Sequence, residues 1–326
     1  MAKTTIAIVH GDPAGIGPEL LIKLLSDKKT TDRANILVIG DPKVFLRGEN
    51  TVGYQIENVR HITNIKNLNF SNCNINHLDI NFEGIDGVPT AAVSATGGAS
   101  TIGGLHRALE LSKNGYVAGI VFMPFNKESM HLGGNDFNDE LGYASQFFKL
   151  KTRASEFNFA NGMWNSRVTS HVAMKDVHNL LNEDLICEEI ALTNQTLELA
   201  GYDRPRIVVS AYNPHAGDGG LMGREEIDVI APAIKKMKQK QIAVNGPLPA
   251  DTLWLKVRDG EYDAVVTMYH DQGQIAIKLL GFDRGVTVLA GLPIPITTPA
   301  HGTAFDIAGQ NKANIVPTQN AFKMAV

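Results

Sequence analysis

The sequence predicts an α/β fold, because short β-branched runs alternate along the chain with longer stretches of helical periodicity. Several of these runs are apolar throughout, as expected for strands that are buried on both faces of a parallel sheet. The chain has 326 residues, of which 44% are hydrophobic. This length and composition suggest two packed domains, or one large one.

Seven segments have the composition of strands, and five have the periodicity of helices. The expected strands are 4–11, 34–41, 116–125, 156–162, 206–214, 263–272 and 285–293. The expected helices are 18–27, 100–113, 175–200, 224–239 and 273–280. The first helix is favoured by Pro18, which suits a first helical turn, and by the acidic Glu19. Residues 45–90 are rich in Asn and Ile and weakly periodic, so we expect short strands and loops there.

Composition excludes several classes of protein. The net charge is −4 and no basic block is present, which argues against nucleic acid as a partner. Cys73 and Cys187 lie far apart and neither belongs to a CxxC pair, so we expect neither a disulfide framework nor a cysteine zinc site. No run approaches ~18 apolar residues, and the N-terminal run is too short for a signal peptide. We therefore expect a soluble cytoplasmic protein that has no membrane partner.

The opening loop, "GDPAGIGPE" (11–19), raises the question of a dinucleotide site. Its glycines, Gly11, Gly15 and Gly17, depart from the G-x-G-x-x-G spacing, and Pro18 replaces a free N–H at the helix start. Asp41 also falls later than the acidic residue of that pattern. Besides a Rossmann site, two interpretations remain open. The loop is an ordinary strand-to-helix turn, or it lines a cleft beside a cofactor that is bound elsewhere.

Three histidines stand out: His215 and His270 directly follow expected strands, and His171 follows a less regular segment. His171 lies in "VTSHVAMKDV", His215 in "SAYNPHAGDGG" and His270 in "VVTMYHDQGQ". Ligands of open α/β sheets bind at the carboxyl ends of strands, so three imidazoles there would form a divalent metal site with positions left for substrate. Nearby polar candidates are Asp251, Asp271 and Gln272. For each histidine alone, a hydrogen-bonded structural role is the alternative. Six other histidines are interpreted as surface or packing residues: His10, His61, His77, His106, His131 and His178.

Two glycine-rich segments remain. The run "GDGGLMGREE" (217–226) is typical of an anion-binding loop before a helix, and equally of a flexible turn. The run "AHGTAFDIAGQNKAN" (300–314) places Gly and Thr at a helix start. Such a loop could hold a nucleotide's ribose and adenine, or it could be a capped turn.

Five motifs together resemble the PdxA family, the 4-hydroxythreonine-4-phosphate dehydrogenases, nearly end to end. They are "GDPAGIGPE", "NPHAGDGG", "GPLPADT" (246–252), "YHDQG" and "HGTAFDIAG". Two of them are also similar to motifs of isocitrate and isopropylmalate dehydrogenases. The resemblance implies a two-domain fold of that kind, not a Rossmann fold, with a cleft between the domains and a homodimeric assembly. It implies a cofactor-side domain of residues 1–126 and 280–326, and a dimerisation and metal-site domain of residues 127–279.

The resemblance also implies cofactors and a reaction. One divalent metal per subunit (Zn, Co, Mn, Ni or Mg) would lie at the dimer interface, held by His171, His215 and His270. NAD or NADP would bind with its adenosine end at Gly15, His301, Gly302, Thr303, Ala304 and Asp306. The implied reaction is oxidative decarboxylation of a 3-hydroxy acid, as in pyridoxine biosynthesis. We expect proton handling or substrate orientation by Lys127, Asp251 and Lys278.

The chain departs from the family at the substrate positions. The family's Gly-His-Thr is replaced by Gly142, Tyr143 and Ala144 within "ELGYASQFF" (140–148). A family Asn and Arg fall on Thr287 and Ile296, and Lys278 is kept. Loss of the Arg and His predicts weaker binding of a phosphate group.

The altered loop suggests an alternative substrate. "GYAS" resembles the Gly-Tyr-x-Ser of terephthalate dihydrodiol dehydrogenases, so the alternative is a dehydrogenase and decarboxylase of a non-phosphorylated cis-dihydrodiol carboxylate. A third interpretation is a metal-binding or sensing protein that has lost catalysis. The intact histidines, Lys278 and "HGTAFDIAG" argue against it.

Overall fold

The computed structural model describes residues 3–326, and the chain divides into two compact units. Unit 1 runs to Lys149 and also includes Val286–Val288 and Leu292–Val326. Unit 2 comprises Leu150–Gly285 and Leu289–Gly291. The chain therefore passes between the units more than once. Residues 127–149, which we assigned from the sequence to the second domain, belong to unit 1.

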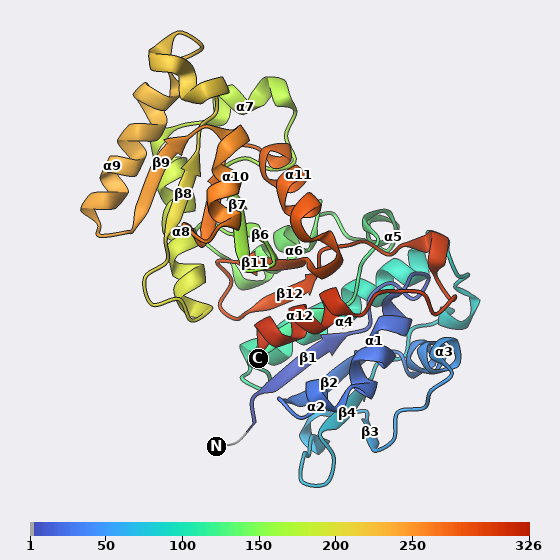
Figure 1. Cartoon of the computed structure of the whole chain (residues 1–326). Coiled ribbons are helices and arrows are strands. Elements are labelled where there is room, and N and C mark those ends of the chain that lie inside the picture. The colour runs from blue at the N-terminus through green and yellow to red at the C-terminus, as the bar shows by residue number, and fades with distance from the viewer. Residues whose placement is uncertain (1–2) are drawn as a thin grey trace. The chain divides into compact units, whose positions relative to one another are not determined.

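The strands of unit 1 are mostly parallel and lie in the order β3-β4-β2-β1-β5-β12-β11, and of β11 only Val286–Val288 belongs to this unit (Figure 1). Only β11 and β12 pair in antiparallel fashion. In the central strands β1 and β2 every residue after the first is buried, which explains the apolar sequences that follow Thr5 and Asn35. The bounds are β1 (Thr5–Val9), β2 (Asn35–Gly40), β3 (Val59–Ile62), β4 (Ile75–Asp79), β5 (Gly119–Phe122), β11 (Val286–Ala290) and β12 (Ile296–Pro299).

Helices cover this sheet, and several begin at side-chain caps. Asp41 accepts a hydrogen bond from the Lys43 N–H at the start of α3, and Ser94 accepts one from the Gly97 N–H at the start of α4. The helices are α1 (Gly17–Ser26), α2 (Lys28–Thr31), α3 (Pro42–Val52), α4 (Ala95–Lys113), α5 (Lys127–Leu132), α6 (Glu140–Phe148) and α12 (Val316–Ala325). Short helical turns are η1 (Ile65–Asn67), η2 (Ile85–Gly87) and η6 (Phe305–Ile307).

Unit 2 has a sheet of order β6-β7-β10-β8-β9, in which only β6 runs antiparallel to its neighbour. Its strands are β6 (Ser155–Ala160), β7 (Met163–Arg167), β8 (Ile207–Ser210), β9 (Val244–Leu248) and β10 (Ala264–Thr267). Its helices are α7 (Met174–Leu180), α8 (Glu183–Leu199), α9 (Ala231–Gln239), α10 (Ala250–Arg258) and α11 (His270–Gly281), with the turns η3 (Pro214–Gly220), η4 (Glu226–Ile230) and η5 (Phe282–Arg284). A hydrophobic cluster joins α10 and α11 to the sheet through Leu253, Ile277, Val208 and Val265.

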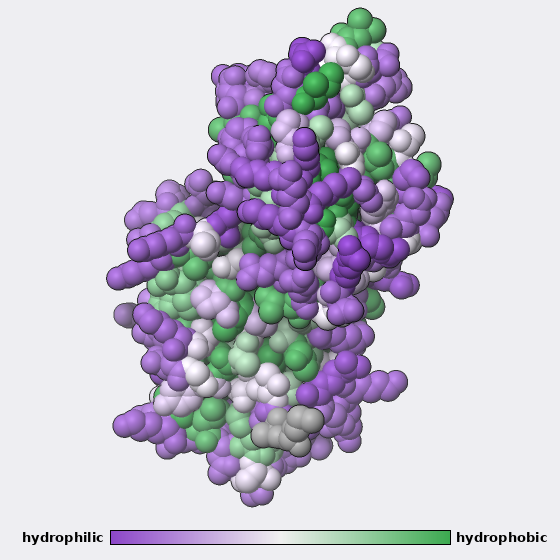
Figure 2. Space-filling model, turned by 90° about the vertical axis from the view of Figure 1, so that its left-hand side faces the viewer, coloured by the Kyte–Doolittle hydropathy of each residue, from purple (hydrophilic) through white to green (hydrophobic). Residues whose placement is uncertain are grey.

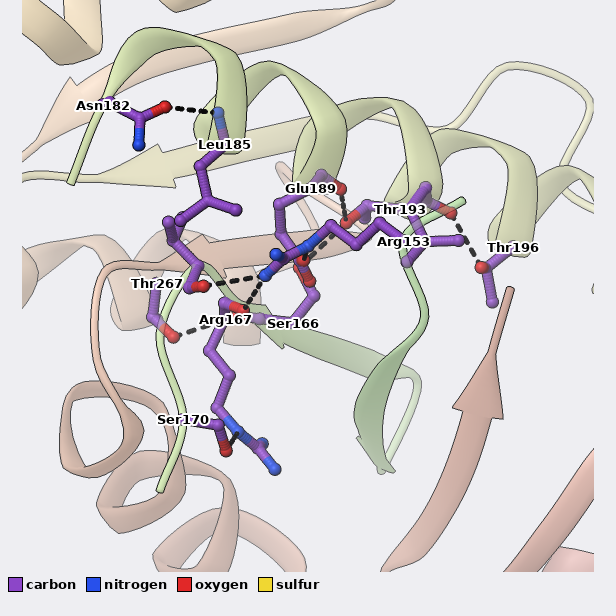
Figure 3. Close-up of polar contacts among 12 residues, drawn as sticks. Arg153, Ser166, Arg167, Ser170, Asn182, Leu185, Glu189, Thr193, Thr196 and Thr267 are labelled. Carbon is purple, nitrogen blue, oxygen red and sulfur yellow. Dashed lines mark hydrogen bonds and ion pairs between the residues drawn. The ribbon is translucent and has the colours of Figure 1, made fainter. Parts of the chain in front are cut away.

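The predicted α/β class is confirmed, and each of the seven expected strands overlaps a strand of the structure. The expected helix 175–200 is two helices, because Asn182 accepts a hydrogen bond from the Leu185 N–H and starts α8 afresh (Figure 3). The expected strand 263–272 ends at Thr267, and α11 begins at His270. Residues 45–90 also contain most of α3, which we did not predict. In the described part of the chain, no helix is both long and apolar enough to span a bilayer.

Candidate functional site

The three strand-end histidines all belong to unit 2. Strands β7, β10 and β8 are parallel neighbours, so their carboxyl ends meet at one edge of the sheet. His171 follows β7, His270 begins the helix after β10, and His215 lies in the turn after β8. The ring centroids of His171 and His270 are 5.6 Å apart. The topology therefore brings at least two of the three imidazoles together.

This pair of rings fits a shared metal ion. Two imidazoles on one tetrahedral metal have centroids about 5 Å apart, given metal–nitrogen distances of about 2.1 Å. His215 does not complete the set within one chain. Among residues 3–326, the histidine, cysteine and acidic groups whose ligand atoms all lie within 4.8 Å of one another are His61, His77 and Asp79, in unit 1.

Two side chains after His270 shape this edge of the sheet. The His270 Nδ1 lies 2.7 Å from Asp271 Oδ1, which leaves Nε2 free to ligate a metal. The Gln272 Oε1 accepts a hydrogen bond from the Met268 N–H, and its Nε2 donates to the Ala211 carbonyl oxygen, both at 2.7 Å. Gln272 therefore ties the end of β10 to the end of β8.

His215 lies in a strained turn. Five successive residues from His215 to Gly219 have positive φ, and three of them, His215, Ala216 and Asp218, are not glycine. A left-handed conformation costs roughly 1–2 kcal/mol for each such residue. Strain of this kind persists only where neighbouring contacts enforce it, and it is frequent at functional sites.

The contact that enforces this turn is buried Glu226. Its Oε1 accepts hydrogen bonds from the N–H groups of Tyr212 (2.8 Å) and Asn213 (2.6 Å). Gly217 passes so close that a Cβ there would lie 2.7 Å from Glu226 Oε2. These two backbone N–H groups therefore donate to a carboxylate of the protein itself. We did not single out Glu226 from the sequence, although its place after a glycine-rich run was a usable signal.

Two arginines, the buried Arg167 and the partly buried Arg153, hold the segment before His171 (Figure 3). The Arg167 Nε donates to Ser170 Oγ at 3.0 Å, and its other nitrogens bind Asn158 and Glu156. Arg153 donates to the Val168 carbonyl oxygen at 2.7 Å and pairs with fully buried Glu189. Burial lowers the pKa of Arg167, while Glu156 and Glu189 raise it. Neither arginine was predicted to have a role.

In unit 1 the opening loop packs against the C-terminal motif. The Ile16 N–H donates to the Thr303 carbonyl oxygen at 3.0 Å, so this N–H is not available to a phosphate. A Cβ at Gly15 would lie 2.8 Å from the Thr303 Cβ. The glycine therefore makes room for Thr303. The loop therefore lies against the segment that we expect to bind the cofactor; whether it lines a cleft beside a bound cofactor stays a prediction.

The C-terminal motif offers a ligand only some of its residues. Gly302 and Asp306 are exposed, whereas Thr303 is buried in contact with the opening loop. Ala304 has a left-handed backbone (φ 43°) that turns the chain between them. Burial lowers the pKa of His301, whose Nδ1 lies 3.2 Å from the Gly302 carbonyl oxygen. We expect Gly302 and Asp306 to be the reachable positions.

The expected catalytic residues are all at the surface. Lys127 is exposed at the start of α5 in unit 1. Asp251 is exposed in the first turn of α10, and Lys278 is exposed on α11, both in unit 2. The Lys278 Nζ lies 5.9 Å from the centroid of the Phe282 ring. Lys278 shares its helix with His270.

Several expected substrate positions have structural contacts. The Tyr143 hydroxyl lies 2.8 Å from His106 Nδ1 of α4, and burial raises the pKa of Tyr143. Ala144 and Ile296 are fully buried, and Ile296 pairs with Ile120 of β5. Thr287 lies on β11 opposite Thr298. In this conformation Ala144 and Ile296 offer no surface to a substrate.

Comparison with known proteins identifies relatives along nearly the whole chain. Residues 32–325 match the family described as pyridoxal phosphate biosynthetic protein PdxA. A relative from Pseudomonas aeruginosa, named putative 4-hydroxythreonine-4-phosphate dehydrogenase 2, is 47% identical over 98% of this chain and 95% of its own length. A relative from Salmonella typhimurium, named D-threonate 4-phosphate dehydrogenase, is 35% identical over 100% of this chain and 99% of its own.

Solved structures agree with these relatives. The 4-hydroxythreonine-4-phosphate dehydrogenase from Klebsiella pneumoniae has a TM-score of 0.86 and 36% identity, over 100% of this chain and 97% of its own. A terephthalate 1,2-cis-dihydrodioldehydrogenase from Burkholderia xenovorans LB400 has a TM-score of 0.69 and 25% identity, over 100% of this chain and 98% of its own. The first of these two structures is thus the more similar in both fold and sequence.

Proposed function

Because this chain belongs to the PdxA family, we propose that it oxidises the CH–OH group of a phosphorylated hydroxy acid and then decarboxylates the product. The substrate class is that of 4-hydroxythreonine-4-phosphate or D-threonate 4-phosphate, the names carried by relatives that cover the chain. The single observation that carries the proposal is this full-length similarity, which includes the fold. The oxidant is NAD or NADP, which accepts a hydride when bound.

The proposal assigns a divalent metal to the strand-end histidines of unit 2. Support comes from the 5.6 Å separation of the His171 and His270 rings and from the strained turn that presents His215. A metal bound there would polarise the substrate hydroxyl and stabilise the negative charge that develops as CO2 leaves. Asp271 orients the His270 ring, and Arg167 anchors Ser170 directly before His171. Lys278 offers a cation to the substrate's carboxylate or phosphate, and Asp251 and Lys127 are proposed to handle protons.

We place the adenosine end of the cofactor on unit 1. Among the expected cofactor-binding residues of the C-terminal motif, Gly302 and Asp306 are the exposed ones, and a carboxylate such as Asp306 can accept hydrogen bonds from ribose hydroxyls. Thr303 supports the loop by filling the space beside Gly15. A side chain larger than hydrogen at residue 15 would displace this support.

A homodimer completes the proposal. Exposed apolar side chains occur on the chain segments that carry the three histidines, and exposed apolar surface is typical of interfaces. They are Val172, Met174, Leu221, Met222, Ile275 and Leu279, with exposed fractions of 41–83%. Hydrophobic side chains also interrupt the hydrophilic surface in Figure 2. Since one chain does not gather all three imidazoles, we propose that a second copy supplies the missing one.

The proposal is tested by following NAD(P)H formation with purified, metal-loaded protein. The substrates are 4-hydroxythreonine-4-phosphate, D-threonate 4-phosphate and a cis-dihydrodiol carboxylate. Turnover of either phosphate supports the proposal. Turnover of the diol alone would favour the alternative suggested by Tyr143. Metal binding without NAD(P) binding or turnover would favour a protein that has lost catalysis.

Glu226→Ala is expected to weaken metal binding by about 10–100-fold, because the turn that carries His215 loses its anchor. The measurement is a Zn²⁺ titration by calorimetry. Glu226→Gln is the matched control, since its Oε1 can still accept from Tyr212 and Asn213. If the alanine variant binds metal as tightly as the parent, the turn that carries His215 does not contribute to the metal site.

Ile296→Arg is expected to lower the free energy of unfolding by on the order of 3 kcal/mol, because a guanidinium without a partner is buried there. If the position faces the phosphate site, inorganic phosphate should stabilise this variant more than it stabilises Ile296→Met. Denaturant unfolding with and without phosphate measures both effects. Equal stabilisation of the two variants would show that the alignment of Ile296 with the family Arg is misleading.

A further inference from the structure

A second cluster of metal-binding side chains lies in unit 1, on strands β3 and β4 (Figure 1). His61 and His77 are direct neighbours across this parallel pair, and Asp79 lies two residues farther along β4. The Asp79 Oδ1 is 2.8 Å from His61 Nδ1 and 2.5 Å from His77 Nδ1. Three potential ligand atoms therefore converge on one point. In the sequence these histidines were interpreted as surface or packing residues.

The cluster is open to solvent on one side only. The His61 side chain is 45% exposed, that of Asp79 is 18% exposed, and that of His77 is fully buried. An ion can thus approach past His61, while His77 and Asp79 fix the inner side of the site.

Contacts behind the cluster hold the buried ring in place. The His77 Nε2 lies 2.9 Å from the Nε2 of buried His10. Phe45 packs edge-on against the rings of His77 and His61, with centroid separations of 5.1 and 6.2 Å. Outer hydrogen bonds and apolar packing of this kind orient the ligands of metal sites.

We propose that His61, His77 and Asp79 bind a divalent transition-metal ion such as Zn²⁺, at a site separate from the strand-end histidines. Two imidazole nitrogens and one carboxylate oxygen suit zinc, whereas Mg²⁺ and Ca²⁺ prefer oxygen ligands alone. Ligand atoms of a tetrahedral zinc site lie about 3.4 Å apart, so each ring needs to withdraw from Asp79 by less than about 1 Å. Three protein ligands leave the fourth position to water.

Metal binding at this site requires the protons to rearrange. Because a carboxylate only accepts hydrogen bonds, Asp79 accepts from the Nδ1–H of both rings, and this leaves the Nε2 of a neutral His77 to accept from the His10 Nε2–H. Ligation needs both Nδ1 lone pairs, so the His61 and His77 protons move to Nε2. The His77–His10 hydrogen bond then reverses, and the His10 proton moves to Nδ1. With neutral rings no net proton is released.

The reversal of the His77–His10 hydrogen bond also affects how tightly the site would bind a metal ion. The His10 Nδ1 is buried and has no hydrogen-bond partner in the described chain, so a proton placed there is unsatisfied. This opposes binding, and we expect an ion that exchanges readily rather than a permanent structural one. Because His10 directly precedes the opening loop, the site would be connected to that loop through one imidazole.

The test uses the full chain with His171→Ala and His215→Ala, so that the strand-end site does not contribute. Calorimetric titration with Zn²⁺ is expected to show one ion per chain. Adding His61→Ala should weaken binding by more than about tenfold, since even outer contacts of metal sites are worth that much. The matched control is His131→Ala, another exposed histidine of unit 1.

A second measurement does not depend on a stable alanine variant. The ¹⁵N NMR signals of the His10 and His77 rings should exchange their protonated and unprotonated nitrogens when Zn²⁺ is added. The proposal is overturned if the parent chain of this test binds no ion, or if His61→Ala and Asp79→Asn bind Zn²⁺ as the parent does. None of these readouts uses enzyme activity, so the result is independent of the proposed reaction.

Discussion

His215→Ala is expected to abolish measurable turnover and to reduce the metal content of the purified protein. Removal of one imidazole leaves two ligands, and the lost Lewis-acid stabilisation, several kcal/mol, corresponds to a rate decrease of at least about a hundredfold. Metal analysis after dialysis and the rate of NAD(P)H formation measure the two effects. If the variant has full metal occupancy and a normal rate, His215 is not a ligand of the metal.

A second substitution separates the chemistry of His215 from the shape of its turn. His215 has a φ of 52°, and Asn is among the residues that tolerate this left-handed region best. His215→Asn therefore keeps the turn and removes the imidazole. We expect it to be as inactive as the alanine variant and more stable. If it is active, the turn rather than the ring is what the site requires.

Mixing two inactive variants tests whether the site is shared between subunits. If His171 and His215 of one metal site come from different chains, a dimer of one His171→Ala and one His215→Ala chain has one intact site. Random exchange of subunits then restores roughly one quarter of the parent activity. If both histidines come from the same chain, every site in the mixture lacks a ligand and no activity returns.

The sequence could predict where two of the three histidines fall but not what holds them. His215 and His270 follow apolar strands, and parallel strands bring their carboxyl ends to one edge, so the positions of these two residues follow from local pattern and general topology. His171 follows β7, whose sequence MWNSR is largely polar and was not among the expected strands, so the sequence pattern alone did not place His171 beside His270. The turn with positive φ values at His215 is held at its start by Glu226, which accepts hydrogen bonds from Tyr212 and Asn213, 14 and 13 residues before it in the sequence. The periodicity of apolar residues in the sequence does not indicate such a contact.

The missed elements have different causes. Helix α3 carried readable signals, since Asp41 caps it, Pro42 begins it and Gly53 ends it with a left-handed residue. Strands β9 and β12 are short and contain proline, so their pairing is decided by neighbouring strands rather than by propensity. The contact between Gly15 and Thr303 joins distant parts of the chain, and only the family resemblance indicated that the two loops belong together.

Arg153→Met is expected to lower the free energy of unfolding by about 3–5 kcal/mol, because it leaves buried Glu189 without its cation. Burial already raises the pKa of Glu189 above 4.5, while Arg153 lowers it. Without Arg153 the folded-state pKa rises further, so the folded protein binds a proton that the unfolded chain releases above pH 4.5. The loss of stability should therefore be larger at pH 7 than at pH 5. Denaturant unfolding at the two pH values measures this difference.

The double variant Arg153→Met/Glu189→Gln separates the cost of an unpaired charge from the loss of a hydrogen bond. A neutral amide at residue 189 needs no cation, so the double variant should be more stable than Arg153→Met and should lose the extra sensitivity to pH. Both variants, however, lack the bond from Arg153 to the Val168 carbonyl oxygen, which holds the segment before His171. If that bond positions His171, the two variants should bind metal equally weakly although their stabilities differ. If metal binding recovers together with stability, Arg153 supports the fold of unit 2 and has no separate effect on His171.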